Sequence, residues 1–234
     1  MQVFVKGAFN LAGPTRQASA VMPYYTISHG IDPSGKNVAN SYSKYIIQDL
    51  LIDTYKYEGV ICTDWTITGD YKDVHIHGGK PWGVETLSVA ERHYEILKAG
   101  VDQFGGNNEK GPVIEAYNMW CKDFGQESAR ERFEHSARKL LMNFFRTGLF
   151  ENPYLDPEET SRVLASKDFR ERGYKAQQKS VVMLKNAGSV LPVKERLKVY
   201  VPKRHIPNTY NLAGKVTVPG KYDWPIEPEY FKKH

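Results

Sequence analysis

The chain has 234 residues, of which 41% are hydrophobic and 25% charged, and its formal net charge is +5. This length and apolar content allow a sizeable core, whereas no apolar run approaches the roughly 20 residues that a membrane helix needs. The positive charge is modest and its basic residues are not interleaved with aromatic ones, which argues against nucleic acid as a partner.

Strand and helix patterns alternate through the first half of the chain. A short apolar run at 18–22 predicts a strand, and the helical spacing of apolar residues predicts a helix at 42–55. A strand at 59–62, a helix at about 86–98 and a strand at about 100–104 follow. This order predicts an α/β fold with a parallel sheet covered by helices, in which the long loop after Asp64 is the place to look for function.

The second half has a different pattern. Residues 126–147 predict a strongly amphipathic helix that Gly148 ends. The stretch GLFENPYLDPEE predicts an extended linker stiffened by two prolines. A helix at about 166–185 and a strand at 197–201 are expected next, and the final 30 or so residues predict irregular structure with an edge strand at best.

The segment YEGVICTDW places a carboxylate and an indole directly after an apolar strand. A strand end holds Asp64 rigidly enough for a catalytic nucleophile, but an aspartate here can equally cap the following turn. Trp65 has two interpretations as well, a platform for a sugar ring or a packed core side chain. Position alone leaves the two alternatives for Asp64 open, whereas for Trp65 it favours packing in the core.

Five segments, in the right order, resemble motifs of glycoside hydrolase family 3 between about residues 15 and 198. The segment YEGVICTDW is similar to the strand that carries that family's nucleophile. The other four match a second strand, a third strand, a linker and the entry to a second domain, and they are SAVMPYYT, AGVDQF, RTGLFENPYLDP and KSVVMLKNAGSVLPV. Together they are far more specific than any one of them.

The resemblance implies a partial (β/α)8 TIM-like barrel, made of about its last three βα units, that leads into the beginning of an α/β sandwich domain. Residues 1–150 would be the C-terminal portion of the barrel. Residues 151–197 would be the linker and connecting helix, and residues 198–234 the incomplete start of the second domain.

The resemblance also implies a function, namely a retaining exo-β-glycosidase of the β-glucosidase type, active in carbohydrate and polysaccharide degradation. Asp64 would form a covalent glycosyl-enzyme intermediate, Trp65 would stack at the rim of the subsite, and Met22 and Tyr25 would line the pocket. A second carboxyl about 5 to 5.5 Å away is required to protonate the leaving oxygen. The substrate would be a β-glucoside or oligosaccharide, with no cofactor and no metal.

The sequence departs from the family pattern in several places. The family's acid/base glutamate lies deeper in the second domain, and Glu227 and Glu229 stand in the wrong context to replace it. The earlier barrel strands have no counterpart either, so a fragment completed by the remainder of the same enzyme is expected, and a homodimer is compatible with its open edges. Thr63 and Tyr24 replace residues that are usually serine.

Other interpretations stay open. The chain could be a catalytically incomplete piece with only a carbohydrate-binding or structural role, or a relative that acts on xylose or arabinose. His75 and His77 have the spacing of metal ligands on a strand, but a polar loop is favoured because no third ligand is evident. The chain begins without a signal-peptide pattern, while family members are often secreted or periplasmic, so the localisation is left open.

Overall fold

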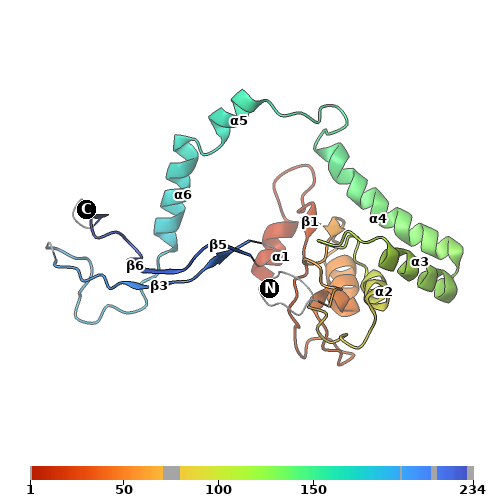
Figure 1. Ribbon diagram of the computed structural model, residues 1–234. Coiled ribbons are helices and arrows are strands. Elements are labelled where there is room, and N and C mark those ends of the chain that lie inside the picture. The colour runs from red at the N-terminus through yellow and green to blue at the C-terminus, as the bar shows by residue number, and fades with distance from the viewer. Residues whose placement is uncertain (1, 71–79, 196, 212–214, 231–234) are drawn as a thin grey trace. The chain divides into compact units, whose positions relative to one another are not determined.

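Figure 1 shows the computed structural model of the protein, which describes residues 2–70, 80–195, 197–211 and 215–230. His75 and His77 lie outside these residues. Between Glu151 and Asn152 the chain divides into two compact units, which are described separately. No helix in the described part of the chain is long and apolar enough to cross a bilayer.

The first unit is organised by short parallel strands. Strand β1 (Ala20–Val21) pairs with β2 (Val60–Ile61) in parallel, with Val21 opposite Ile61. The next residue, Cys62, forms a parallel bridge with Gln103. The strands predicted at 18–22 and 59–62 are therefore confirmed, whereas the one predicted at 100–104 is reduced to this single bridge.

The helix predicted at 42–55 is not an α-helix. A 3-10 turn, η1 (Asn40–Tyr42), precedes a π-helix, η2 (Tyr45–Thr54). The wider helix has bonds between residues five apart, as in the 2.9 Å bond from the Tyr55 amide to the Leu50 carbonyl. The apolar spacing located the helix correctly, but that spacing does not distinguish the two helix types.

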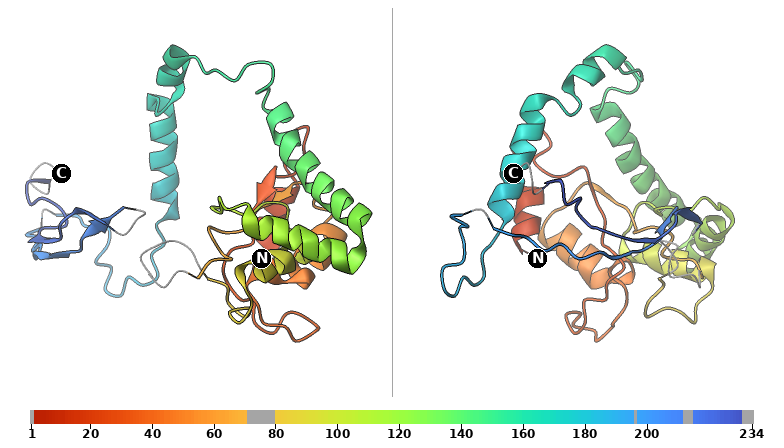
Figure 2. Two further views of the ribbon diagram at one scale, coloured as in Figure 1. Left: turned by 45° about the vertical axis from the view of Figure 1, so that its right-hand side comes forward. Right: turned by 60° about the vertical axis from the view of Figure 1, so that its left-hand side comes forward.

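Three α-helices complete this unit, and a short helix, α1 (Gln2–Phe9), begins it. Helix α2 (Val89–Ala99) begins three residues later than predicted, because Ser88 caps it and forms a capping box with Glu91. Helix α3 (Gly111–Phe124) packs against α2 and against α4 (Gln126–Arg146), as Figures 1 and 2 show. Both cysteines, Cys62 and Cys121, are free and half-buried.

Helix α4 confirms the amphipathic pattern and the predicted end. Gly148 adopts a φ of +69°, and its amide donates to the carbonyl of Phe145. The Leu149 amide donates to the carbonyl of Phe144. These two bonds form a Schellman motif, which glycine favours because it has no Cβ to resist the left-handed conformation.

The core of the first unit lies between the strands and helices η2 and α2. Its members are fully buried aliphatic side chains, namely Ile47, Ile61, Ile67, Ile96 and Val101. A second, smaller cluster of Tyr94, Leu97 and Ala116 joins α2 to α3, and Phe133 of α4 packs against it. Strand β2 is therefore covered by apolar side chains up to the point where the polar segment beginning at Thr63 follows.

A buried carboxylate ties α4 to β2. The Asp102 side chain is 1% exposed, and its Oδ2 accepts hydrogen bonds of 3.0 Å from the Ile61 amide and from Lys139 Nζ. Its Oδ1 accepts from the Ser136 hydroxyl at 2.8 Å, and the Arg132 guanidinium lies 3.9 Å away. Buried charge of this kind is tolerated only when it is paired and hydrogen-bonded, as it is here.

The second unit corrects several predictions. Residues predicted as extended linker include a helix, α5 (Pro157–Val163), because Asp156 caps it by accepting from the amides of Glu158 and Glu159. Helix α6 (Lys167–Ser180) ends five residues before the predicted end, where the β-branched Val181 and Val182 follow. No strand forms among the described residues of 197–201.

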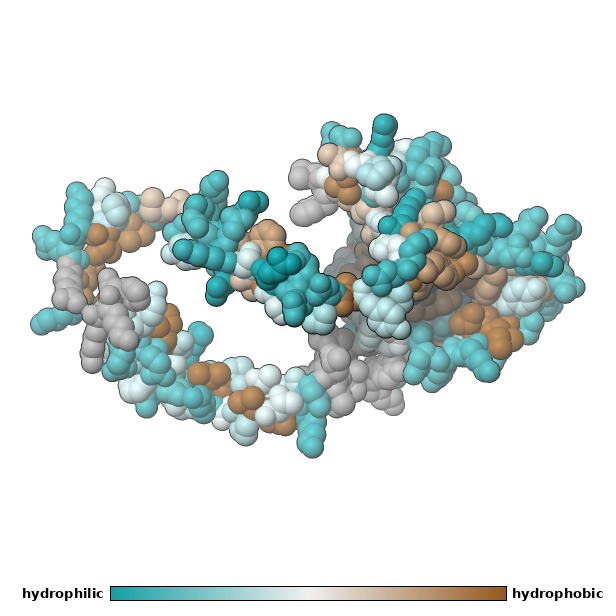
Figure 3. Space-filling model, turned by 90° about the horizontal axis from the view of Figure 1, so that it is seen from above, coloured by the Kyte–Doolittle hydropathy of each residue, from teal (hydrophilic) through white to brown (hydrophobic). Residues whose placement is uncertain are grey.

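The end of the chain is more regular than predicted. Strand β3 (Arg204–Ile206) pairs antiparallel with β6 (Lys221–Asp223), and β4 (Thr209–Tyr210) pairs antiparallel with β5 (Val216–Val218). Apolar side chains of this unit remain uncovered, and Figure 3 shows several of them as brown patches among polar neighbours. Four consecutive exposed ones lie directly after α6, namely Val181, Val182, Met183 and Leu184.

The Asp102 cluster predicts a large and specific loss of stability. Asp102→Asn removes the charge that Lys139 and Arg132 share and turns an amide NH2 donor towards groups that themselves donate, so we expect the free energy of unfolding to fall by about 3 to 5 kcal/mol in urea titrations. Glu134→Gln, which breaks an exposed pair with Arg130, should change little. Equal effects of the two substitutions would contradict a structural role for the buried cluster.

Candidate active site

Backbone bonds from both sides fix the segment that carries Asp64. The Cys62 amide donates to the Val21 carbonyl at 3.0 Å, and the Thr63 amide donates to the Gln103 carbonyl at 2.9 Å. The Thr63 hydroxyl in turn accepts from the Gly105 amide at 2.8 Å. Asp64 thus follows directly after a strand that is hydrogen-bonded to a neighbouring segment on each side. Its backbone therefore has little conformational freedom.

The Asp64 carboxylate is nearly buried, with 9% of the residue exposed. Its Oδ1 accepts a 2.6 Å hydrogen bond from the Trp65 amide, so the side chain caps its own turn. The Tyr25 hydroxyl donates to the Trp65 carbonyl at 2.5 Å. The capping interpretation of Asp64 is therefore realised, and the Tyr25 hydroxyl also interacts with this carboxylate.

Asp64 and Tyr25 influence each other electrostatically. Burial, and then the negative charge and hydrogen bonding of the Asp64 carboxylate, raise the pKa of Tyr25 well above its usual value. The tyrosine consequently stays protonated through the neutral range and remains a hydrogen-bond donor beside the carboxylate. The structure brings together three of the four predicted site residues, Asp64, Trp65 and Tyr25.

Trp65 is not a core side chain. It is 57% exposed, and its indole lies against the backbone of Gly106 in the turn that follows Gln103. An exposed, flat aromatic face next to a carboxylate is a surface on which a sugar ring can stack.

Met22 lines a hollow that is separate from Asp64. It is 55% exposed and lines an apolar hollow of about 270 Å³ together with Phe9, Ile46 and Tyr55. Asp64 does not line this hollow. The fourth predicted site residue is therefore near the site in sequence, but it does not share a hollow with the carboxylate.

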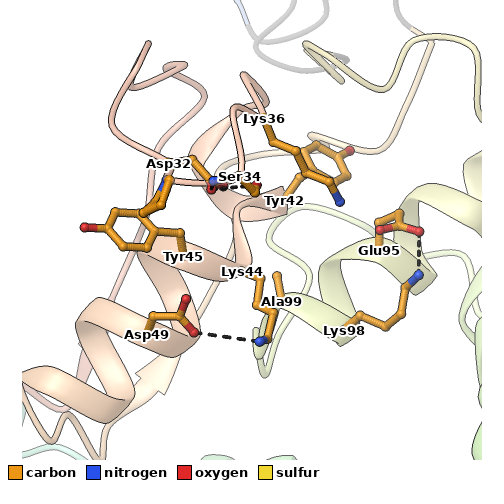
Figure 4. A pocket seen from close by; sticks show the side chains of 11 residues that line it. Asp32, Ser34, Lys36, Tyr42, Lys44, Tyr45, Asp49, Glu95, Lys98 and Ala99 are labelled. Atoms are coloured by element: carbon orange, nitrogen blue, oxygen red, sulfur yellow. Dashed lines mark hydrogen bonds and ion pairs between the residues drawn. The ribbon is translucent and has the colours of Figure 1, made fainter.

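A polar hollow near η2 is also separate from Asp64. Figure 4 shows this space of about 530 Å³, where Lys44 pairs with Asp49 and Lys98 with Glu95. Two of its lysines are therefore already paired with carboxylates of the protein. Among the described residues there is also no group of three or more His, Cys, Asp or Glu side chains that could hold a metal ion.

The sequence did not point to Arg92, which organises the segment after Trp65. Its side chain is 3% exposed and donates to the Thr68 carbonyl and to Asp70 Oδ1, at 3.0 and 2.6 Å. It also donates to the carbonyls of Val84 and Glu85, at 3.3 and 2.7 Å. One guanidinium therefore joins two stretches of chain that are far apart in sequence, and the only signal was a charge on the buried face of a helix.

Curated relatives share about three quarters of this chain. A probable β-glucosidase C of Aspergillus flavus is 36% identical over 179 residues, which are 76% of this chain and 27% of the relative. A periplasmic β-glucosidase/β-xylosidase of Dickeya chrysanthemi is 31% identical over 197 residues, 79% of this chain and 29% of the relative. The chain thus spans just over a quarter of the length of these relatives. No family model matches the sequence.

Solved structures share the fold. A β-glucosidase from Erythrobacter marinus matches 82% of this chain and 29% of its own length, with a TM-score of 0.54 at 21% identity. A β-glucoside phosphorylase bound to 2FGlc matches 76% of this chain and 31% of its own, with a TM-score of 0.54 at 16% identity. At these identities the likeness concerns the fold alone.

Arg92 predicts how the segment after Trp65 is held. Arg92→Lys keeps the charge but cannot reach all four acceptors, so we expect a loss of about 1 to 3 kcal/mol in unfolding free energy. Hydrogen exchange should become faster at residues 67–70 and 84–85 while α3 and α4 stay protected. Uniformly faster exchange would mean that Arg92 acts on the whole unit rather than on this segment.

Proposed function

We propose, on the premise that this chain is a relative of β-glucosidases and resembles glycoside hydrolase family 3, that it carries the nucleophile of a retaining β-glucosidase. Asp64 would attack the anomeric carbon of a terminal β-glucosyl unit and form a glycosyl-enzyme ester, which water would then hydrolyse. The single observation that carries this proposal is a nearly buried carboxylate, fixed at the end of a parallel strand, beside an exposed indole.

The geometry supports a nucleophile in two ways. A nucleophilic carboxylate must be held in place, and the Asp64 backbone is fixed by β1 on one side and by Gln103 on the other. One of its oxygens is engaged by the Trp65 amide, which leaves the second oxygen as the atom that would attack. The protonated Tyr25 hydroxyl stays a hydrogen-bond donor beside it.

The proposed fold is a portion of a (β/α)8 barrel. Parallel segments at β1, β2 and Gln103 follow one another in chain order, with helices between them, as barrel units do. The two hollows described above do not include Asp64 in their lining. We therefore propose that residues outside this chain complete the sugar pocket and supply the acid/base carboxyl, either as the remainder of the same enzyme or in a second copy.

Trp65 and Tyr25 would shape the substrate site next to Asp64. The exposed indole offers a stacking face for a sugar or aglycone, and the tyrosine hydroxyl stands next to the carboxylate. Met22 would contribute only if the completed pocket reached the apolar hollow that it lines. The relative named β-glucosidase/β-xylosidase leaves xylose open as a second sugar.

Two other functions remain candidates. Without a general acid the chain would be a carbohydrate-binding or structural portion. Because one structure with the same fold is named a β-glucoside phosphorylase, phosphate is also a candidate acceptor in place of water. The released product distinguishes these cases, since hydrolysis gives glucose, phosphorolysis gives a glucose phosphate, and a binding module gives neither.

Covalent trapping tests the nucleophile directly. An activated 2-deoxy-2-fluoro-β-glucoside should add one fluoroglucosyl group to the peptide that contains Asp64, because fluorine slows hydrolysis of the ester and the activated leaving group needs no acid. Peptide mass spectrometry locates the label. Asp64→Asn should abolish it, whereas Asp49→Asn, a carboxylate on η2, should not. A label on another residue would refute the assignment.

The leaving group tests whether the general acid is present. A dinitrophenyl β-glucoside should be cleaved slowly by this chain, whereas cellobiose should react at least about 100-fold more slowly, because it needs protonation of the leaving oxygen. Azide, which attacks without a general base, should accelerate turnover of the dinitrophenyl substrate and yield a glucosyl azide. Comparable rates on both glucosides would show that an acid is available and contradict its proposed absence from this chain.

A further inference from the structure

Left-handed backbone follows each of the three parallel segments. Tyr24 has a φ of +67°, Thr66 of +49° and Gly106 of +67°. Tyrosine and threonine are strained in this region, and such strain persists only where the surroundings over-determine the backbone. The three turns lie at the same ends of neighbouring strands, around Asp64 and Trp65. The backbone conformation at this edge of the sheet is therefore closely constrained by its surroundings.

The main chain of Trp65 is fixed on both sides. Its amide donates to Asp64 Oδ1, and its carbonyl accepts from the Tyr25 hydroxyl. The next amide, that of Thr66, donates to the Gly105 carbonyl at 2.8 Å. Only the indole retains freedom to move, and more than half of the residue is exposed.

The indole rests on Gly106. A Cβ placed on Gly106 would lie 2.6 Å from Trp65 Cδ2, 2.7 Å from Cε2 and 2.8 Å from Cγ. These distances are well inside van der Waals contact, so the ring lies directly on the bare Cα. Any larger residue would displace the exposed indole, because the backbone of this turn is bonded to the segment that follows Asp64.

We propose that Gly106 is a positioning residue for the Trp65 indole and thereby determines specificity for the group attached to the glucosyl unit. This inference rests on the proposed function of Asp64. The absence of a side chain at Gly106 lets the ring lie low beside the carboxylate. A methyl group there would tilt the ring towards the space in which the aglycone would sit, without touching Asp64 itself.

Fluorine NMR of 5-fluorotryptophan-labelled protein can test this proposal on the full chain. The four tryptophans give one resonance each, and Trp65→Phe identifies that of Trp65. Gly106→Ala should shift the Trp65 resonance and leave those of Trp82, Trp120 and Trp224 unchanged. Gly30→Ala is the matched control, because Gly30 has a similar φ of +72° but nothing within 4 Å of an added Cβ.

The link to specificity is tested with phenyl 1-thio-β-D-glucopyranoside, whose sulfur linkage resists cleavage. It should shift the Trp65 resonance of the unsubstituted protein. Gly106→Ala should weaken this binding by about threefold to tenfold, as expected for a lost aromatic contact, and should weaken glucose binding less. Gly30→Ala should leave both affinities unchanged.

Three results would overturn the proposal in distinguishable ways. An unmoved Trp65 resonance in Gly106→Ala, or an equal shift in Gly30→Ala, would refute the positioning role. If Gly106→Ala shifts the Trp65 resonance, but that resonance in the unsubstituted protein responds neither to the thioglucoside nor to glucose, the positioning role stands. The specificity role and the proposed sugar site would then both be refuted. A Trp65 signal that responds to sugar, with affinities unaffected by Gly106→Ala, would refute the specificity role alone.

A double-mutant cycle keeps the test decisive if Gly106→Ala is poorly folded. When the destabilisation comes from the clash with the indole, Gly106→Ala should be better tolerated in a Trp65→Ala background, and the two changes should not be additive in urea unfolding. Additive effects would show that the cost is backbone strain alone and would refute the contact.

Discussion

The organisation of the first unit depends on one buried carboxylate. Asp102 accepts from the amide of Ile61, three residues before Asp64, and from side chains on α4. A paired buried charge has one acceptable arrangement, because any shift leaves donors unsatisfied in a medium that solvates them poorly. The position of β2 relative to α4 is therefore fixed more closely than apolar packing alone would fix it. Because Asp64 follows β2 directly, the position of its turn is constrained as well.

This edge of the sheet combines rigid and adjustable parts. The backbone from Cys62 to Thr66 is bonded to neighbouring segments, whereas the Trp65 indole is exposed and rests on a glycine. A reaction at a fixed carboxylate needs this rigidity, since misplacement of a nucleophile by about 1 Å is costly. Under the proposed function, a ring repositioned by Gly106 would let the site vary the groups that it accepts while the Asp64 carboxylate stays in place.

The second unit has a different physical character. Its described strands form two short antiparallel pairs, and apolar side chains after α6 remain in contact with solvent. Exposed apolar area costs about 25 cal/mol per Å² relative to burial, so such a segment gains stability from anything that covers it.

The sequence by itself determined the local features: the parallel strands around Val21 and Ile61, the amphipathic α4 with its Gly148 terminus, and the carboxylate and indole after β2. These depend on periodicity and on single residues with strong backbone preferences. Only the tertiary structure decided that η2 is a π-helix and that the strand predicted at 100–104 is a single bridge. It alone also decided which groups the buried Asp102 and Arg92 side chains bind, and that the Trp65 indole packs on Gly106. Each of these depends on groups that are distant in sequence, and a pattern of neighbouring residues carries no information about which distant donor or bare backbone a side chain will meet.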